Sequence, residues 1–455
     1  MSETSVQRNK RVLLFAAKLG YQTRSFDEVA RKLGLDLTFV TDRCHQLDDP
    51  WGDRAIPVHF ETPEVAAYEV LQAVRSSNTS PDGILVLGDR PAVAAAYVAR
   101  GLALPYNHPA AVEACRSKLR MREIFREAGL PTPWFRSVSL HPVPEPALLG
   151  ISYPCVLKPL SLSASQGVVR ASNRAEFLVA AERIRRLLAS PEIAATREPH
   201  LDQIIVEGFI PGKEVAVEGL ITDGALRILA IFDKPDPLDG PYFEESIYVT
   251  PSRLPEAQLR AIERRAKEAV RALGLSHGPI HAEFRINDER LSDERLNYEG
   301  VWPLEVAPRP IGGLCARALH FIDHSGRVGS PDEAIGLEEL LLRHSVSLPG
   351  SDAPREFRAA AVMMIPVPRS GILESITGEK EVRATTNITE LHITARLHDY
   401  ISAWPEGSSY LGFLFAQANT PADAEAALRE AHAKLKFTLN PRLPVEHPAT
   451  RQIVE

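Results

Sequence analysis

The chain has 455 residues, of which 44% are hydrophobic and 24% charged, so it is long enough for roughly two to four domains with separate cores. Its formal charge of -7 comes without a concentrated basic run, which argues against binding to a nucleic-acid backbone. No stretch approaches the roughly 20 apolar residues of a membrane span. Residues 1–10 lead to no secretion signal, so we expect a cytoplasmic protein.

The four cysteines are widely separated and suit a reducing compartment. They form no CxxC pair, and their spacing therefore predicts neither a zinc site nor a disulfide framework. The residues concerned are Cys44, Cys115, Cys155 and Cys315.

The first hundred residues alternate between short apolar runs and helical patterns, which predicts βαβ units on a parallel sheet. Ala16-Ala17-Lys18-Leu19-Gly20 after the first run lacks the three glycines of a dinucleotide-binding turn, which argues against a nicotinamide or flavin cofactor. The expected strands are 12–15, 37–40 and 84–87, and the expected helices are 25–33 and 91–100.

The middle of the chain begins with an expected helix over 111–128, which ends at Gly129 before two prolines and marks a new domain. Asn173 and Glu176 form a capping box, and Asp223-Gly224 is typical of a hairpin turn. The remaining elements expected here are strands 155–158, 204–206, 214–221, 225–231, 280–286 and 302–306, and a helix over 255–273.

The last hundred residues predict a smaller α+β unit. Strand candidates lie around 362–365, 391–397 and 411–415, and Thr420 and Pro421 begin a final helix.

Phosphoryl transfer from ATP needs cations along the triphosphate, carboxylates for magnesium and a cover that excludes water. Lys118 and Lys158 are candidate phosphate contacts, although a single lysine is usually just solvated. The loop 161–167 offers backbone N–H and hydroxyl groups to phosphate oxygens, or is a plain connection. The segment 207–214 offers Glu207 to an adenine edge and Glu214 to a ribose, or is a simple strand-turn-strand with solvated acids.

Glu283 and Glu305 are the strongest candidates, because each carboxylate lies in an apolar strand and therefore needs a partner. Magnesium explains two acids on adjacent strands. Ion pairs with Arg285 and Arg309 are the structural alternative.

Taken in order, these residues resemble the ATP-grasp superfamily over nearly the whole chain. The strings His281-Ala-Glu-Phe-Arg and Arg309-Pro-Ile-Gly-Gly, with the tail 371–437, look like the L-amino-acid ligase branch. The resemblance implies a mixed α/β and α+β fold. It divides the chain into a Rossmann-like pre-ATP-grasp domain (1–108), a two-lobed ATP-grasp domain (109–330) with a flexible lobe at about 133–212, and a C-terminal α+β subdomain (331–455).

The resemblance also implies roles for individual residues. Glu283 and Glu305 would hold Mg²⁺, or Mn²⁺ in its place, although many members carry an asparagine ligand where this chain has Ala307. Arg309, Lys158 and His281 would act in catalysis, and His281, Arg309, Gly312 and Gly313 would bind substrate. The ATP contacts would be Lys118, Lys158, Ser165, Gln166, Gly167, Glu207, Gly208, Phe209, Ile210 and Glu214.

The implied activity is ligation of a small-molecule carboxylate to an amine through an acyl phosphate, with release of ADP and phosphate, by a homodimer. The segment 233–250 is a candidate substrate-facing loop or a solvated connection. Two other functions stay open: a bicarbonate-activating carboxylase or purine-synthesis enzyme of the same fold, and a sensor that binds ATP without catalysis, which only Ala307 favours.

Overall fold

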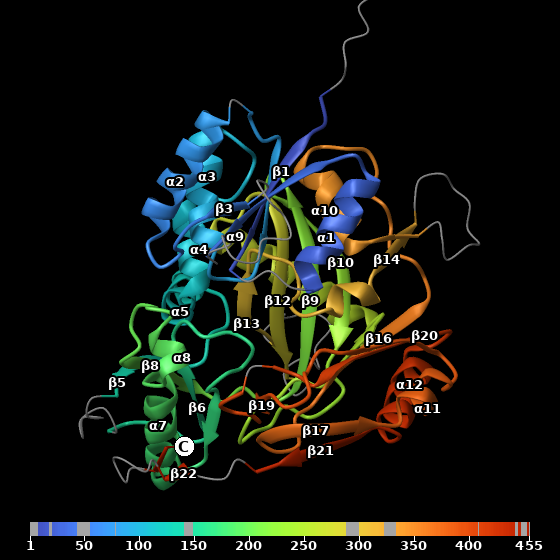
Figure 1. The fold of residues 1–455 in the computed structure, drawn as a ribbon. Helices are drawn as coiled ribbons and strands as arrows, with labels where there is room; N and C mark the ends of the chain where they lie inside the picture. Colours follow the sequence, from blue (N-terminus) through green and yellow to red (C-terminus); the bar gives the residue numbers. More distant parts are fainter. Residues whose placement is uncertain are drawn as a thin grey trace, which may run out of the picture.

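The computed structural model describes residues 8–17, 21–42, 55–77, 79–140, 149–287, 300–322, 334–407, 409–441, 445–446 and 453–454. A small parallel sheet, a four-stranded lobe and one large sheet follow one another along the chain (Figure 1). Cys44, residues 18–20 and most of the charged loop before Trp302 lie outside the described residues. Within the described ranges, no helix combines the length and apolar character needed to cross a membrane.

The N-terminal sheet is parallel, as the alternating pattern predicted, with strand order β3-β2-β1-β4. Its apolar strands are buried on both sides, because helices and the large sheet cover the two faces. The elements are β1 (Arg11–Ala16), α1 (Tyr21–Lys32), β2 (Asp36–Thr41), β3 (Ala55–Pro57), α2 (Pro63–Ser76), β4 (Gly83–Leu87) and α3 (Ala92–Leu102).

The single helix expected over 111–128 is wrong, because the structure has two helices that meet at Ser117. Ser117 has an extended backbone, and its hydroxyl accepts a hydrogen bond from the Arg120 N–H at the start of the second helix. A serine cap therefore begins a new helix where periodicity alone suggested continuation. The helices are α4 (Pro109–Arg116) and α5 (Lys118–Glu127).

A four-stranded antiparallel lobe follows, with strand order β5-β8-β6-β7 (Figure 1, lower left). The Asn173 cap is confirmed, because Asn173 accepts from the Glu176 N–H, but the Glu176 carboxylate accepts from the Ser172 N–H, one residue before the cap expected in a capping box. The elements are β5 (Phe135–Ser139), β6 (Cys155–Pro159), β7 (Val169–Ala171), α7 (Arg174–Leu188), α8 (Pro191–Ala194) and β8 (Gln203–Gly208).

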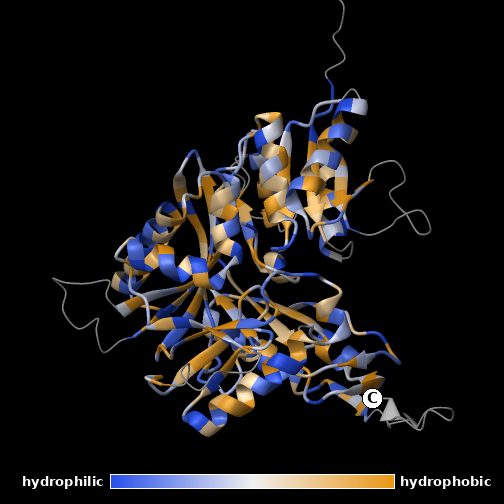
Figure 2. Cartoon of the chain, turned by 90° about the vertical axis from the view of Figure 1, so that its left-hand side faces the viewer, coloured by the Kyte–Doolittle hydropathy of each residue, from blue (hydrophilic) through white to orange (hydrophobic). Residues whose placement is uncertain are grey.

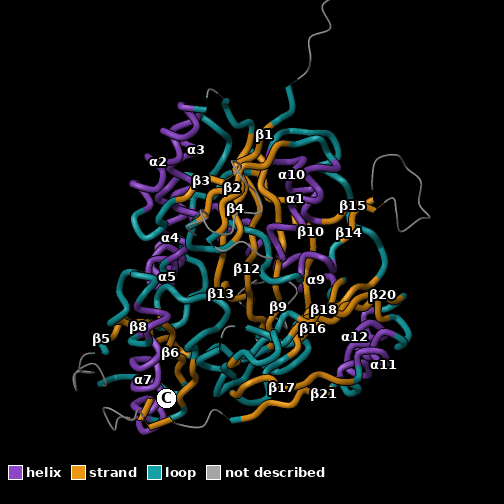
Figure 3. The backbone as a smooth tube through the Cα atoms, in the orientation of Figure 1, coloured by secondary structure: helices purple, strands orange, loops and turns teal. Residues whose placement is uncertain are grey.

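The large sheet is antiparallel, in the order β13-β12-β9-β10-β11-β16-β20-β18, and joins strands from the middle and the end of the chain (Figure 3). The strands are β9 (Lys213–Thr222), β10 (Ala225–Asp233), β11 (Ile247–Thr250), β12 (Gly278–Ile286), β13 (Val301–Ala307), β16 (Ala359–Ile365), β18 (Ile388–Ile393) and β20 (Gly412–Ala418). The strand expected over 391–397 ends early, at Ile393.

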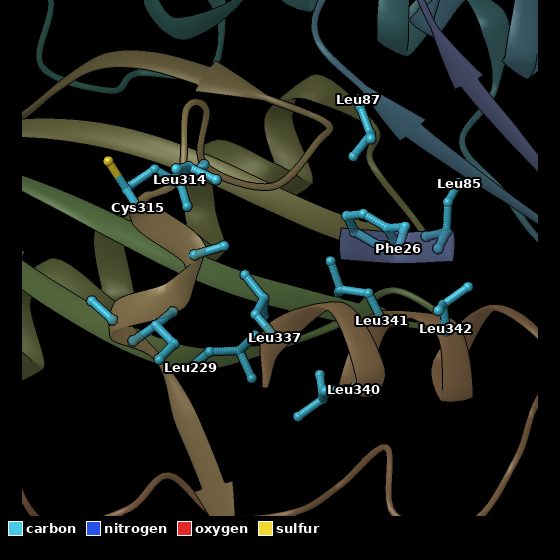
Figure 4. Packing of buried hydrophobic residues seen from close by; sticks show 14 of the residues in the cluster. Phe26, Leu85, Leu87, Leu229, Leu314, Cys315, Leu337, Leu340, Leu341 and Leu342 are labelled. Atoms are coloured by element: carbon cyan, nitrogen blue, oxygen red, sulfur yellow. The ribbon is translucent and has the colours of Figure 1, made fainter. Parts of the chain in front are cut away.

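One face of the large sheet packs against α9 (Glu256–Leu273), and the other faces the N-terminal sheet and α10 (Leu337–Ser345). Figure 4 shows leucines of α10 beside Phe26 of α1 and Leu85 of β4. Figure 2 shows strands coloured mainly as hydrophobic and helices that carry both colours, as expected for amphipathic helices covering buried sheets.

The C-terminal region adds a short sheet, in the order β19-β17-β21, and helices outside the large sheet. Because β16, β20 and β18 pair into the large sheet, no sheet boundary separates residues 109–330 from 331–455, and the domain division stays a prediction. The other elements are η4 (Cys315–Ala318), β14 (His320–Ile322), β15 (Ala334–Gly336), β17 (Gly371–Thr377), α11 (Glu379–Arg383), β19 (Tyr400–Ile401), α12 (Pro421–His432), β21 (Lys436–Asn440), β22 (Val445–Glu446) and β23 (Ile453–Val454).

The Asn173 cap gives a test of the lobe. Asn173→Ala removes an acceptor for the first-turn N–H groups, so the free energy of opening α7 should fall by about 1 kcal/mol. Hydrogen exchange of the α7 amides measures this change. Val179→Ala, at a position of α7 that is 69% exposed, is the control and should alter protection by less than about 0.5 kcal/mol. Unchanged protection in Asn173→Ala would contradict the assignment of the cap.

Candidate active site

A cavity of about 890 Å³ lies where the four-stranded lobe, the large sheet and the N-terminal sheet meet. Every residue to which the sequence gave a role lines this cavity, except Gln166 and Gly167. The lining therefore includes Lys118, Lys158, Ser165, Glu207, Gly208, Phe209, Ile210, Glu214, His281, Glu283, Glu305, Arg309, Gly312 and Gly313.

Glu283 and Glu305 face each other across adjacent strands. They are register partners in the antiparallel pair β12 and β13, and a bulge follows Glu283. Side chains alternate along β12: 280, 282, 284 and 286 pack in the core beneath α9, whereas 281, 283 and 285 line the cavity. The two carboxylates therefore reach one space from neighbouring strands.

Two lysines line the cavity near acidic residues: Lys118 lies beside Glu305, and Lys158 lies beside Glu207. The Lys118 Nζ is 3.6 Å from a Glu305 oxygen and donates to the Leu162 carbonyl at 2.6 Å, and Lys158 bonds to Glu207. The alternative pairing of Glu283 and Glu305 with arginines is not what the structure has. Arg285 pairs with Glu214 at 3.0 Å, and Arg309 pairs with Asp89.

Lys234, which the sequence did not single out, lies among three carboxylates. Its buried ammonium donates to Glu214 and Glu283 at 2.8 Å each, and also to Glu245. Burial lowers the pKa of Lys234, but the three glutamates outweigh it and hold that pKa well above its ordinary value. One oxygen of each glutamate lies within 4.8 Å of the others, so these acids could also hold a cation. The segment 233–250 thus contributes to the cavity wall, and Phe243, Glu245 and Tyr248 line it.

Glu245 and Glu283 differ in how readily they hold a proton. Burial raises the pKa of Glu245 to about 7, with Glu283 nearby adding to the effect and Lys234 opposing it. Burial also opposes ionisation of Glu283, but Lys234 and His281 outweigh it and hold the pKa of Glu283 well below its ordinary value. Glu283 is therefore ionised at neutral pH and suited to a metal cation.

His281 is held by Glu218, its register partner on β9. Its Nδ1 bonds to the Glu218 carboxylate, and its Nε2 lies 3.7 Å from a Glu283 oxygen. Burial lowers the pKa of His281, but Glu218 outweighs it and raises that pKa to about 9. His281 is therefore a cation at neutral pH, which suits contact with an anionic group better than removal of a proton.

Both carboxylate oxygens of Glu207 are paired with cations. Arg122 donates to both of its oxygens, at 2.8 and 3.3 Å, and Lys158 bonds to it as well. Burial raises the pKa of Glu207, but Arg122 and Lys158 outweigh it and lower that pKa to about 2. Arg122 also donates to the Leu304 carbonyl at 2.8 Å, so it joins α5, β8 and β13.

Arg309 is fixed by a residue from the N-terminal sheet. Asp89, just beyond β4, accepts two hydrogen bonds from its guanidinium, at 2.8 and 3.0 Å. This fork holds the guanidinium in one orientation at the carboxyl end of a parallel strand, where ligands of such sheets usually bind.

Gln166 and Gly167 contact the C-terminal region instead of lining the cavity. Gln166 Nε2 donates to the Glu406 carbonyl at 2.7 Å, and the Gly167 N–H donates to the Pro405 carbonyl at 3.0 Å. Arg183 on α7 adds an ion pair with the Glu406 carboxylate. These contacts join the four-stranded lobe to the loop after β19.

The donors fit a magnesium ion. Glu283 and Glu305 supply carboxylate oxygens from facing positions, and oxygen is the ligand that magnesium prefers. Ala307, at the end of β13, offers no side-chain oxygen, and its register partner is His281.

Lys234, Glu245, Arg122, Asp89 and Glu218 are the functional candidates that the sequence analysis missed. Each acts through an ion pair or hydrogen bond between distant segments, as in Arg122 with Glu207 and Asp89 with Arg309. Of these residues, the sequence pointed only to Lys234 and Glu245, because both lie in the segment 233–250, a candidate substrate-facing loop.

The His281–Glu218 pair gives a pH test. Because the pKa of His281 is raised from 6.5 to about 9, its contribution to stability is complete below pH 6.5 and is lost as the pH rises through about 9. Glu218→Gln should therefore reduce the loss of thermal stability between pH 7.5 and 9.5. ¹⁵N NMR of the histidine rings measures the same pKa directly. A His281 ring that titrates near 6.5 in the unaltered protein would contradict this assignment.

Two family models match the chain. The ATP-grasp domain matches residues 151–318, and the L-amino acid ligase C-terminal domain 2 matches residues 363–440. The first range contains Lys158, Glu207, Glu283, Glu305 and Arg309, and the second contains strands that wall the cavity.

The chain is also similar to a curated ATP-grasp enzyme and a curated ligase. ATP-grasp enzyme fsqD of Aspergillus fumigatus is 23% identical over 353 residues, which are 69% of this chain and 59% of that protein. Alanine–anticapsin ligase of Bacillus subtilis is 29% identical over 195 residues, or 40% of each chain. The chain thus spans less than two thirds of the length of either relative.

Solved structures extend the likeness to nearly the whole chain. The L-amino acid ligase from Bacillus licheniformis is 27% identical with a TM-score of 0.76, covering 95% of this chain and all of that one. Biotin carboxylase from Campylobacter jejuni, at 14% identity and a TM-score of 0.60 over 95% of this chain and 92% of that one, shares the fold alone. The chain thus contains an ATP-grasp domain and an L-amino acid ligase C-terminal domain, and its fold is similar over nearly its whole length to that of a solved L-amino acid ligase.

Proposed function

We propose that this chain is an ATP-dependent carboxylate–amine ligase that joins amino acids through an acyl phosphate. The observation that carries the proposal is the facing pair Glu283 and Glu305, in one cavity with Lys118, Lys158 and Arg309. The names of the L-amino acid ligase and alanine–anticapsin ligase support amino acids as substrates, and the matched C-terminal domain favours amine ligation over bicarbonate activation.

The nucleotide would lie between the lobe and the large sheet. Phe209 and Ile210 after β8 offer an apolar slot for adenine, with Gly208 beside them and Glu214 facing the ribose. Lys118 and Lys158 bring positive charge to the triphosphate. Carboxylates hold both lysines in place, so their charges are already oriented when the nucleotide binds.

Glu283 and Glu305 would hold Mg²⁺, or Mn²⁺ in its place. The metal supplies Lewis acidity that neutralises charge on the transferring phosphoryl group. The chain contributes the two carboxylates, with Lys234 hydrogen-bonded to Glu283 and Lys118 beside Glu305. Water or another oxygen would complete the coordination where Ala307 stands.

Arg309 would bind the substrate carboxylate and steady the acyl phosphate, aided by N–H groups of Gly312 and Gly313 and by the protonated His281. An oxygen of that carboxylate attacks the γ-phosphorus, and the bond to ADP breaks. The amine nitrogen then attacks the carbonyl carbon, phosphate leaves, and the nitrogen gives up its proton. Amide, ADP and phosphate are the products.

An acyl phosphate hydrolyses readily, so the cavity must exclude water. The loop 161–167 covers it: Ser163, Ala164 and Ser165 line the cavity, and Lys118 bonds to the Leu162 carbonyl. The loop would thus contact the nucleotide and also form part of the cavity wall.

The two acids give a direct test of the reaction. Glu283→Gln and Glu305→Gln should each lower ADP release by about 100-fold or more, because a neutral amide holds magnesium poorly. Phosphate release with pairs of amino acids, followed by mass spectrometry of the product, measures the activity. Glu263→Gln on α9, which removes a surface pair with Lys267, is the matched control and should be unaffected. Turnover that needs bicarbonate in place of an amine would overturn the proposal.

Asp89 gives a second test, of positioning. Asp89→Asn leaves Arg309 without its charged partner, so the KM for the carboxylate substrate should rise about tenfold or more, as for loss of a hydrogen bond to a charged group. The KM for ATP should stay the same, because Asp89 acts through Arg309. Equal rises in both constants would show a general structural role for Asp89.

A further inference from the structure

Beyond the charged residues, the cavity has a second apolar end that the nucleotide does not explain. The first end lies in the lobe, where Phe209 and Ile210 would receive adenine. The charged belt of Lys118, Lys158, Glu283, Glu305 and Arg309 follows. The other end is built by the large sheet and the C-terminal region, from Tyr248, Ile311, Cys315, Met364, Tyr410 and Phe413.

This second end, called here the aromatic end, adjoins the belt directly. A Glu245 oxygen lies within 4.8 Å of a Glu283 oxygen, and the Tyr248 hydroxyl donates to the other Glu245 oxygen at 2.7 Å. On the opposite side, the loop from Arg309 reaches Gly313 in four residues. A small molecule with its carboxylate at Arg309 can therefore place a side chain in the aromatic end.

Packing holds the aromatic end in shape before any ligand arrives. Tyr410 stacks on Trp404 with ring centroids 4.9 Å apart and meets Phe413 edge-on at 6.2 Å. Gly313 has a φ of +64°, and a Cβ there would lie 2.9 Å from the Phe413 ring. The glycine therefore lets the Phe413 ring pack against the loop that carries Arg309.

The six residues of the aromatic end carry no full charge, although Arg396 and Asp399 of the C-terminal region also line the cavity. Burial raises the pKa of the Cys315 thiol and of the Tyr410 hydroxyl, so both are neutral at physiological pH. A charged side chain would lose its hydration there without an ionic partner, whereas an apolar one would gain from leaving water. The acid at its border is Glu245, whose two oxygens already accept from Lys234 and Tyr248.

We propose that the carboxylate substrate is an α-amino acid with an uncharged, apolar side chain of branched or aromatic size, which packs against Met364, Tyr410 and Phe413. The proposal rests on the ligase function and specifies its substrate. It makes Tyr410, supplied by the C-terminal region, a specificity-determining residue.

Hydroxylamine trapping tests the proposal without knowledge of the amine. Its nitrogen attacks the acyl phosphate, phosphate leaves, and the hydroxamate of the carboxylate substrate accumulates. The full chain with ATP and Mg²⁺ should trap leucine, methionine or phenylalanine with a kcat/KM at least about tenfold above aspartate, lysine or glycine. Equal or better trapping of the charged or small amino acids would overturn the side-chain assignment. No hydroxamate from any carboxylate would overturn the ligase function itself.

Variants of Tyr410 test whether the substrate side chain binds in the aromatic end. Tyr410→Ser should lower kcat/KM for the preferred amino acid about tenfold and narrow its advantage over glycine, with the KM for ATP unchanged. Tyr410→Phe keeps the ring and should retain the preference. Phe357→Ala removes a side chain that is 90% exposed and should match the unaltered protein. A Tyr410→Ser enzyme that keeps the full preference, or loses activity equally on all substrates, would contradict the placement of the side chain.

Discussion

The ammonium of Lys234 holds together the wall on which the candidate active site is built. Three half-buried glutamates converge on it, from β9, from the segment before β11, and from β12. Without a cation, carboxylates this close would repel strongly or take up protons. Lys234 and His281 together hold the pKa of Glu283 below its ordinary value, so these two cations set the charge that Glu283 offers to a metal.

A similar arrangement recurs around the cavity, where three further cations are each paired with a carboxylate from another element. Arg122 on α5 holds Glu207 on β8, Asp89 after β4 holds Arg309 after β13, and Glu218 on β9 holds His281 on β12. These pairs bring the small parallel sheet, the lobe and the large sheet to one chamber. They also fix charge directions in advance, which is what electrostatic catalysis requires.

The sequence predicted the features that depend on residues close together in the chain. Glu283 and Glu305 stood out because acids in apolar strands need partners, and Asn173 with Glu176 stood out because capping needs a fixed spacing. The partnership of Lys234 with three glutamates could not be predicted, because it depends on strand pairing between distant segments. For the same reason, nothing in the sequence showed that β16 and β20 extend the large sheet and wall the cavity. At Ser117 the prediction of one helix failed for a different reason. The serine caps a new helix there, although the helical periodicity of the sequence continues through this position.

The lobe is tied to a loop far downstream, since Gln166 and Arg183 both bond to Glu406. Because Gln166 bonds to the backbone carbonyl of Glu406, only the ion pair with Arg183 depends on the side chain at that position. Replacement of Glu406 would therefore loosen the contact between α7 and this loop without removing the hydrogen bond that holds Gln166.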